Sequence, residues 1–156
     1  MLTARATLIL GVRRMYTLDR ESGSEYVDIS VYSVPDLQRP LFDNVIPTAK
    51  FKKTKKGESF GPSWSTHWFK IILVVPERFK KYERVEFHWD AHNEGLVYTE
   101  DGEPVQGLTG GGERVEYLLP KSFLDGKPHT IYVEMSCNAM FGNPNGDTIQ
   151  PPDPNR

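Results

Sequence analysis

Residues 68–75 read Trp68-Phe69-Lys70-Ile71-Ile72-Leu73-Val74-Val75, and Pro76 ends the run. This stretch decides the fold class because it is short, almost wholly apolar and rich in β-branched residues. Strands that are buried in a sheet show continuous apolar runs of this length, whereas helices need a longer segment. The run therefore predicts a buried β-strand.

Residues 85–90 alternate between an apolar set (Val85, Phe87, Trp89) and a polar set (Glu86, His88, Asp90). Successive side chains of a strand point to opposite faces, so this pattern predicts a strand with one face in water. Large aromatic side chains dominate the cores of β-sandwiches. We therefore expect Trp89 and Trp68 to lie on inward strand faces, in the core.

Four further stretches have strand-like patterns: 26–32, 96–99, 115–119 and 130–136. Asp101-Gly102 and Asp125-Gly126 are turn signals between them. Short strands at this spacing, punctuated by Gly and Pro, predict an all-β fold, a β-sandwich.

Helical signals are weak along the chain. We expect no helix beyond about one turn near Phe79, and an irregular, basic segment over residues 41–57. Gly107 and Gly110–Gly112 suit turns with positive φ, and no strand–loop–helix context indicates a phosphate site.

Composition excludes several classes of function. A chain of 156 residues with 38% hydrophobic and 26% charged residues suits one domain with a real core. The net charge of −2 gives no basic field for nucleic acid. The single cysteine, Cys137, cannot form an internal disulfide, which suits a reducing compartment, and it reads as a buried structural residue.

No apolar run approaches the roughly 20 residues that span a bilayer, so we expect no membrane partner. Residues 1–25 form an arm of uncertain structure. Arg5, Arg13 and Arg14 with no acid before Asp19 loosely suit a transit peptide, whereas a first strand or short helix on the domain is the plainer interpretation. The segment carries no convincing secretory signal, so we expect a cytoplasmic protein that could be delivered to a vacuole or lysosome.

Several motifs together resemble a known family. They are Ser59–Lys70 (SFGPSWSTHWFK), Trp89-Asp90, Glu94–Val97, Gln106–Gly111, Glu134–Gly142 (EMSCNAMFG) and the terminal IQPPDPNR. In this order they resemble the N-terminal domain of cytosolic and vacuolar α-mannosidases of glycoside hydrolase family 38, from about Tyr26 to Arg156. The strand order also resembles the galactose-binding-like jelly roll. Residues 1–25 do not match the family's pattern.

The resemblance implies that this chain is a non-catalytic β-sandwich over residues 26–142, which packs on and supports a catalytic domain. Residues 143–156, rich in Pro, read as an extended linker toward that domain. Met140 and Phe141 follow the last expected strand and lie next to the linker, so we expect them in or near an apolar face that docks on the catalytic domain. The whole enzyme would hydrolyse terminal α-mannose of oligosaccharides with retention, would hold a zinc ion in the catalytic domain, and would form a homo-oligomer.

The residues of this chain give little support to two kinds of chemistry, glycoside hydrolysis and zinc binding. A retaining glycosidase needs two carboxyl groups about 5–5.5 Å apart, and nothing in the sequence fixes Asp90, Glu94 or Asp101 in such a pair. His88, Asp90 and His92 would share a face of an unbroken strand and suit zinc, but the strand is expected to end near Asp90. We therefore expect no catalytic and no metal residue in this chain, and no cofactor.

A saccharide site rests on aromatic and polar residues near the ends of strands. Trp64, in an expected loop, could offer a flat apolar face, and Asp90, Glu94 and Asn138 could bond hydroxyl groups of a mannose-containing oligosaccharide. The sequence thus leaves three functions open: an accessory domain of an α-mannosidase, which it favours; a stand-alone carbohydrate-binding or protein-interaction module; and a truncated gene product.

Overall fold

The computed structural model describes residues 2–3, 5–7, 23–109 and 114–138, and the side chains from residue 23 onward. Strands account for most of the regular structure. The strands are β1 Leu2–Thr3, β2 Arg5–Thr7, β3 Val27–Ser33, β4 Lys52–Lys53, β5 Ser59–Phe60, β6 Thr66–Val74, β7 Glu86–Asp90, β8 Glu94–Thr99, β9 Pro104–Leu108, β10 Glu116–Leu118 and β11 Pro128–Ser136. The helical elements are the four-residue α1 Phe42–Val45 and three short 3₁₀ turns, η1 Pro35–Leu37, η2 Glu77–Lys81 and η3 Lys121–Phe123.

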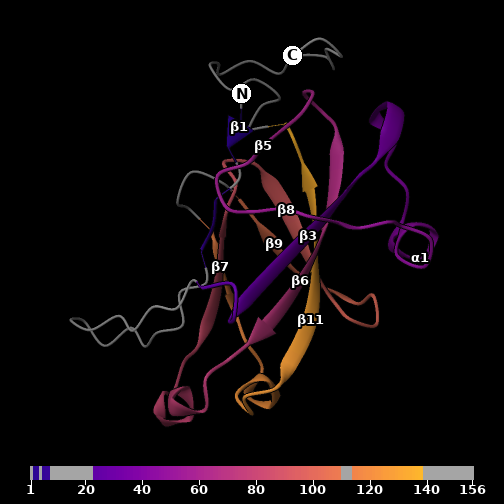
Figure 1. The fold of residues 1–156 in the computed structure, drawn as a ribbon. Helices are drawn as coiled ribbons and strands as arrows, with labels where there is room; N and C mark the ends of the chain where they lie inside the picture. The colour runs from indigo at the N-terminus through magenta and orange to yellow at the C-terminus, as the bar shows by residue number, and fades with distance from the viewer. Residues whose placement is uncertain (1, 4, 8–22, 110–113, 139–156) are drawn as a thin grey trace.

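The largest sheet has six strands in the order β4-β3-β6-β11-β8-β9 (Figure 1). A second sheet has the order β10-β7-β2, and β1 pairs with β5. Every pairing is antiparallel. The strand β6, which contains the apolar run 66–74, pairs with β11 on one side and β3 on the other, so the run lies in a central strand as its sequence predicts.

The principal core fills the space between the six-stranded and three-stranded sheets. The large sheet contributes apolar residues at every second position, and β7 and β10 supply the opposing layer. The fully buried members include Phe69, Ile71, Leu73, Val97, Ile131, Val133 and Met135 from the large sheet, and Val85, Phe87, Trp89 and Tyr117 from the other. This two-layer arrangement confirms the all-β sandwich, and the alternation over 85–89 is confirmed because Val85, Phe87 and Trp89 are at most 2% exposed.

A second apolar cluster covers the outer face of the six-stranded sheet. Trp68 and Tyr132 lie at its centre, and the segment that contains α1 closes over them with Phe42. The ring of Phe42 contacts Trp68, Tyr98 and Tyr132, with centroids 5.3–5.8 Å apart. The prediction that Trp68 is buried is confirmed, but the prediction that it faces inward is wrong. In β6 it has the opposite parity to the core residues Phe69 and Ile71, so it lies on the other face.

The segment 41–57 is more regular than the sequence indicates. It forms α1 and the short strand β4, and Val45 of α1 is buried in the second cluster. The helix escaped prediction because it has a single turn, and a pattern of period 3.6 needs a longer stretch to be visible. The lysines of β4 are exposed and lie at the edge of the large sheet, where Lys53 pairs with Asp28. Exposed lysines at a sheet edge discourage pairing with another chain.

Two Asp-Gly turns are confirmed by the backbone. Gly102 has φ of +88° and Gly126 has φ of +76°, a region that favours glycine. The prediction of a positive-φ turn at Gly107 is wrong, since Gly107 lies within β9 and pairs with Leu96. Gly110–Gly112 lie outside the described residues.

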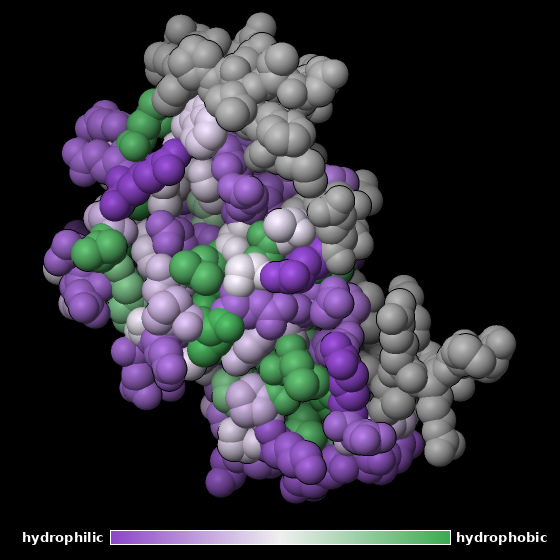
Figure 2. Space-filling model, turned by 180° about the vertical axis from the view of Figure 1, so that it is seen from behind, coloured by the Kyte–Doolittle hydropathy of each residue, from purple (hydrophilic) through white to green (hydrophobic). Residues whose placement is uncertain are grey.

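The first residues also pair with the body of the fold, since β1 joins β5 and β2 joins β7. Within the described ranges, no helix is long and apolar enough to cross a membrane. Figure 2 shows hydrophobic residues in small groups among hydrophilic ones on the far side of the molecule. Among the residues that the structure describes, the exposed large hydrophobic side chains are those of Leu41, Val105 and Leu118, which lie on three different segments. The expected docking residues Met140 and Phe141 lie outside the described part of the chain.

Candidate functional site

Two of the residues predicted to bind a saccharide lie side by side. Glu94 begins β8, and Asn138 follows the end of β11, on the strand that pairs with β8. The side-chain amide of Asn138 donates a hydrogen bond of 2.7 Å to Oε2 of Glu94. Asn138 is only 7% exposed, so this bond fixes the carboxylate at the end of the sheet.

Trp64 lies close to this pair through the backbone. Its amide donates to the carbonyl of Cys137, 2.9 Å away, and its own φ is +66°, which confirms the predicted loop position. The guanidinium carbon of Arg39 lies 5.4 Å from the centroid of the Trp64 ring. A cation over an aromatic face is attracted by the ring quadrupole, so Trp64 holds the head of an otherwise exposed arginine.

Glu94 and Arg39 line an open depression of about 200 Å³ on the outer face of the six-stranded sheet. Two rows of paired residues form its floor. Glu94, Ser136 and Thr66 form the first row, and Leu96, Glu134 and Trp68 are aligned in the second. Arg39 lines the depression from the segment before α1. We call this the outer pocket, and it borders the second apolar cluster.

The second carboxylate of the outer pocket, Glu134, is held by Tyr98. The hydroxyl of Tyr98 donates to Oε2 of Glu134 across 3.1 Å. Burial raises the pKa of Glu134, while the bond from Tyr98 and the charge of Arg39 act in the opposite direction. Burial and the adjacent Glu134 carboxylate raise the pKa of Tyr98 to about 12. Tyr98 therefore stays a hydrogen-bond donor at physiological pH.

Two buried polar atoms near the outer pocket lack partners within the part of the chain that is described. They are Oγ of Ser136, which lines the pocket, and Oδ1 of Asn138. A buried polar group without a hydrogen bond costs about 1–3 kcal/mol. Such groups are expected where a ligand or another chemical group completes the hydrogen bonding.

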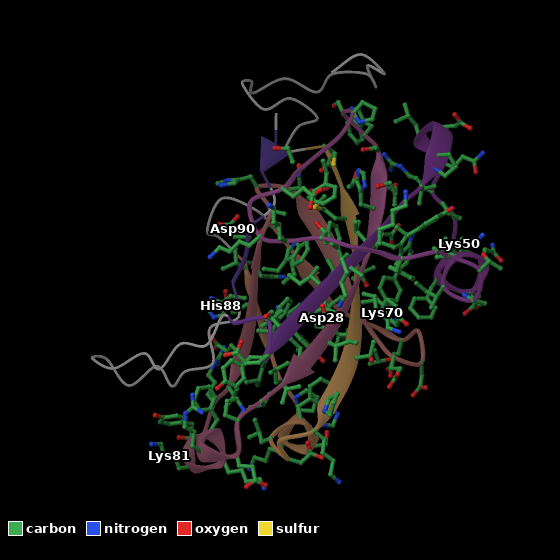
Figure 3. The ribbon with its side chains drawn as sticks, in the orientation of Figure 1. Asp28, Lys50, Lys70, Lys81, His88 and Asp90 are labelled. Atoms are coloured by element: carbon green, nitrogen blue, oxygen red, sulfur yellow. The ribbon has the colours of Figure 1, made fainter. Side chains whose placement is uncertain are left out.

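Asp90, the fourth residue predicted to bind a saccharide, lies on the other layer. It ends β7 with its side chain on the solvent face of the small sheet, as the alternation with buried Trp89 shows. Figure 3 shows His88 and Asp90 along one side of the sandwich and Lys70 and Lys50 toward the opposite side. The structure therefore brings together Trp64, Glu94 and Asn138 but not Asp90.

The possible zinc ligands His88, Asp90 and His92 do not form a site. Nε2 of His88 lies 2.9 Å from Oε2 of Glu86, and Oδ1 of Asp90 accepts the backbone amide of His92. Burial alone would raise the pKa of Glu86, but hydrogen bonds from His88 and Arg84 lower it. Over residues 2–3, 5–7, 23–109 and 114–138, no group of three His, Cys, Asp or Glu residues is arranged to hold a metal ion.

A cluster of Ser, His and Cys residues lies at one end of the principal core. Nε2 of His67 lies 2.8 Å from Oγ of Ser65, and its Nδ1 lies 2.9 Å from Oγ of Ser33. Burial lowers the pKa of His67 to about 4 and raises the pKa of the Cys137 thiol. Ser65, His67 and Cys137 are at most 3% exposed. The cluster has no access for a substrate, and it is a structural network.

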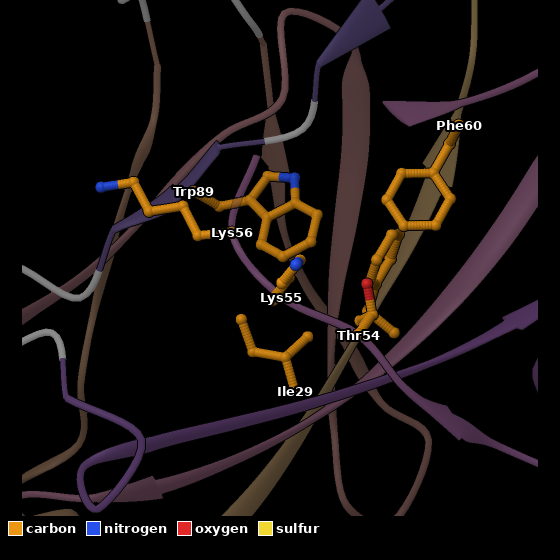
Figure 4. A pocket seen from close by; sticks show the side chains of 7 residues that line it. Ile29, Thr54, Lys55, Lys56, Phe60 and Trp89 are labelled. Carbon is orange, nitrogen blue, oxygen red and sulfur yellow. The ribbon is translucent and has the colours of Figure 1, made fainter. Parts of the chain in front are cut away.

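A narrow gap opens between the two layers beside Trp89. Figure 4 shows the indole of Trp89 above Ile29, with Thr54 and Phe60 across the gap and Lys55 and Lys56 in front. Its volume is about 10 Å³, which is about the minimum for one water molecule. The gap cannot hold an organic ligand.

Two charged residues of the outer pocket, Arg39 and Glu134, were not found from the sequence. Arg39 follows a proline-rich turn and precedes α1, with no motif around it, and Glu134 occupies one of the polar positions of an alternating strand. Alternation does place Glu134 on the outer face of β11. It does not reveal that the segment before α1 brings Arg39 to that face.

The fold and the sheet geometry define an all-β jelly-roll domain. A profile described as the jelly-roll domain of α-mannosidase matches residues 24–156. The chain therefore belongs to the family of α-mannosidase jelly-roll domains.

The curated relatives are much longer proteins. The chain is 42% identical to an "Alpha-mannosidase" of Saccharomyces cerevisiae over 149 residues, which is 90% of this chain and 13% of the yeast protein. It is 43% identical to "Alpha-mannosidase 2C1" of Homo sapiens over 108 residues, 68% of this chain and 10% of the human protein. It is 42% identical to "Alpha-mannosidase G" of Dictyostelium discoideum over 110 residues, 69% of this chain and 10% of that protein. The chain thus spans only 10–13% of the length of these relatives.

Proposed function

We propose that this chain serves as a non-catalytic jelly-roll domain of an α-mannosidase, and that it packs on and supports a catalytic domain elsewhere in the enzyme. The observation that carries the proposal is the family match over residues 24–156. In addition, the part of each relative that matches this chain is only about one-tenth of that relative's length. A fold does not by itself define a reaction, so the mannosidase function rests on these comparisons.

The side chains of the described residues support an accessory role. Glu94 and Glu134, the carboxylates of the outer pocket, are both held by neutral donors, Asn138 and Tyr98. A general acid or a nucleophile would instead need a carboxyl pair flanking a bound glycosidic oxygen.

The zinc ion of the proposed enzyme does not fit this chain. Among residues 2–3, 5–7, 23–109 and 114–138, no cluster of His, Cys, Asp or Glu suits a metal, and His88 is engaged with Glu86. We place the zinc ion, and the retaining hydrolysis of terminal α-mannose in oligosaccharides, in the catalytic domain of a glycoside hydrolase family 38 enzyme.

The remaining features of the proposed enzyme concern its assembly and its place in the cell. Residues 26–142 form the sandwich, to which β1 and β2 of the N-terminal arm 1–25 add strands, and residues 143–156 are a linker that leads to the catalytic domain, on which Met140 and Phe141 dock. The whole enzyme is a homo-oligomer of the cytoplasm that can be delivered to a vacuole or lysosome.

An activity assay tests the proposal. The purified chain is incubated with an aryl α-mannoside, with and without added Zn²⁺, beside an intact α-mannosidase as positive control. We expect no release of the aryl group above the uncatalysed rate in either condition. Turnover that requires zinc and is lost in a His88→Ala variant would contradict the accessory role and would restore the metal site that the geometry does not show.

A further inference from the structure

We propose that the outer pocket binds one hexose ring of a saccharide, in contact with Glu94, Glu134, Arg39 and Ser136. The proposal is argued from the residues of the pocket and does not rest on the function proposed above. The steps below derive the class of ligand from the pocket itself.

The arrangement of donors and acceptors favours a ligand rich in hydroxyl groups. Oε2 of Glu94 accepts from Asn138 and Oε2 of Glu134 accepts from Tyr98, so each carboxylate keeps capacity to accept further bonds. Arg39 supplies donors on the same rim, and Oγ of Ser136 is buried without a partner in the described structure. Hydroxyl groups both donate and accept, so a polyol can satisfy all of these groups together.

The charges disfavour an anionic ligand. One guanidinium and two carboxylates line the same small space, so negative charge predominates and an anion is repelled by Glu94 and Glu134. Hydrogen bonds to charged groups are roughly twice as strong as those between neutral groups. An uncharged polyol therefore gains charge-assisted bonds without introducing a net charge into the pocket.

The size and the floor of the pocket favour a single ring. Its volume of about 200 Å³ is below the roughly 300–1,000 Å³ of pockets for drug-sized ligands. Leu96 lies beside Glu134 on the floor of the pocket, and its side chain offers an apolar surface for the C–H face of a pyranose. Trp64 acts indirectly, since Arg39 lies over its ring; it positions the arginine.

The surrounding structure holds the pocket in shape before a ligand arrives. The floor strands β6, β11 and β8 pair continuously, and the buried Asn138 fixes Glu94. A site on paired strands loses little conformational entropy on binding. The depression is nevertheless open to solvent, so we expect a Kd on the order of 1 mM for a monosaccharide.

Amide chemical shifts of the complete chain test the proposal during titration with methyl α-D-mannopyranoside. We expect saturable shifts at Gly95, Leu96, Glu134 and Ser136, and none at Phe87, His88 or Trp89 of β7. Saturable shifts confined to β7, or no shifts up to about 50 mM, fifty times the Kd expected, would overturn the proposal.

Variants identify the groups responsible. Glu94→Gln keeps the shape and the acceptor for Asn138 but removes the charge, and Arg39→Ala removes an exposed side chain. Each should weaken binding at least tenfold. The matched control is Asp90→Asn, which removes the charge of a carboxylate on the other layer. It should leave the Kd within a factor of two. Unchanged binding in both pocket variants, or loss in the Asp90→Asn control, would contradict the site.

A second probe separates a saccharide pocket from a docking point for a basic side chain. Nα-acetyl-arginine amide, titrated under the same conditions, should not compete with the methyl mannoside. If it shifts the same amides and the sugar does not, the outer pocket binds a cationic side chain and the saccharide proposal is wrong. Because the readout involves no hydrolysis, it stays separate from the assay of the proposed enzyme function.

Discussion

The two faces of the six-stranded sheet differ in what they are used for. The centre of the inner face is apolar, and its residues Ile71, Val97 and Val133 are fully buried against the second layer. The outer face is divided. Around Trp68 it is covered by the segment that carries α1, and beside Glu94 it opens into the outer pocket.

This difference shows how one sheet serves both stability and recognition. A strand places alternate residues on opposite faces, so β11 can give Val133 and Met135 to the core while Glu134 and Ser136 face outward. The inner set contributes the hydrophobic free energy of folding. The outer set is free to carry polar groups. The predictions below test how far the two faces differ in their contribution to stability.

The largest effect is expected at Trp89, on the inner side. Trp89 is 2% exposed, and its ring contacts Phe69 with centroids 4.7 Å apart. Trp89→Ala should lower the free energy of unfolding by about 3–5 kcal/mol, because it removes a large buried side chain and leaves a cavity. Thermal unfolding should show a fall of at least about 6 °C in Tm.

The control for this variant is Leu118→Ala, at a position that is 50% exposed on β10. It should shift the free energy of unfolding by less than about 0.5 kcal/mol. A Trp89→Ala chain with a Tm within two degrees of the unchanged protein would mean that this tryptophan is not part of the core and that the facing of β7 is wrong.

The pH dependence of stability should report His67, at the end of the inner face. Its pKa in the folded chain is about 4, because of burial, against 6.5 ordinarily. The unfolded chain therefore binds more protons between these values. The contribution of neutral His67 to the free energy of unfolding is therefore fully present above about pH 6.5. It is lost as the pH falls toward 4, and the total loss is about 3 kcal/mol.

The measurement is urea unfolding at pH 7, 6, 5 and 4.5 for the unchanged chain and for His67→Gln. Carboxylates titrate in both, so the difference between the two curves isolates the histidine. We expect the unchanged chain to lose stability faster than His67→Gln below pH 6.5. Parallel curves would show that His67 is not buried in its neutral form. The control is His129→Gln, which replaces a partly exposed histidine that contacts Asp125. Its free energy of unfolding should fall below pH 6.5 as steeply as that of the unchanged chain.

A smaller effect is expected on the outer face, at Phe42. This side chain is half-buried and closes the segment of α1 over Trp68 and Tyr132. Phe42→Ala should cost about 1–3 kcal/mol, less than a buried core aromatic, because part of the ring is already in water. The loss should be local. Near-ultraviolet circular dichroism of the aromatic cluster should change, while urea unfolding keeps a single cooperative transition. A cost equal to that of Trp89→Ala would erase the distinction between the two faces.

The sequence predicted the inner face well and the outer face poorly, for a physical reason. The inner residues of β6 and β7 appear as an apolar run and as an alternation, and both patterns report burial directly. Trp68 shared the apolar run with Phe69, so its opposite facing was hidden. Covering of the outer face depends on a loop 20–30 residues earlier in the chain, and local patterns contain no information about that contact.

The candidate site shows the same limit. Glu94, Asn138 and Trp64 were predicted from their residue types near strand ends, and the structure brings them together. Asp90 was included on the same grounds, as an acceptor for hydroxyl groups near the end of a strand. The chain passes between the layers from β7 to β8, so the two carboxylates lie on opposite sides of the sandwich. Glu134 was placed in the pocket by the sheet register, and Arg39 by the course of the segment before α1.

Native-state hydrogen exchange tests most directly whether the segment that covers the outer face is less stable than the core on the inner face. The amides of Ile71 and Val133 lie in the centre of the large sheet, and those of Ile46 and Ala49 bond within the covering segment, to Phe42 and Val45. We predict that Ile71 and Val133 exchange only through global unfolding. Ile46 and Ala49 should exchange through a local opening with a free energy at least about 2 kcal/mol lower. Equal opening free energies at all four amides would contradict the account, because the covering segment would then be as integral to the fold as the core.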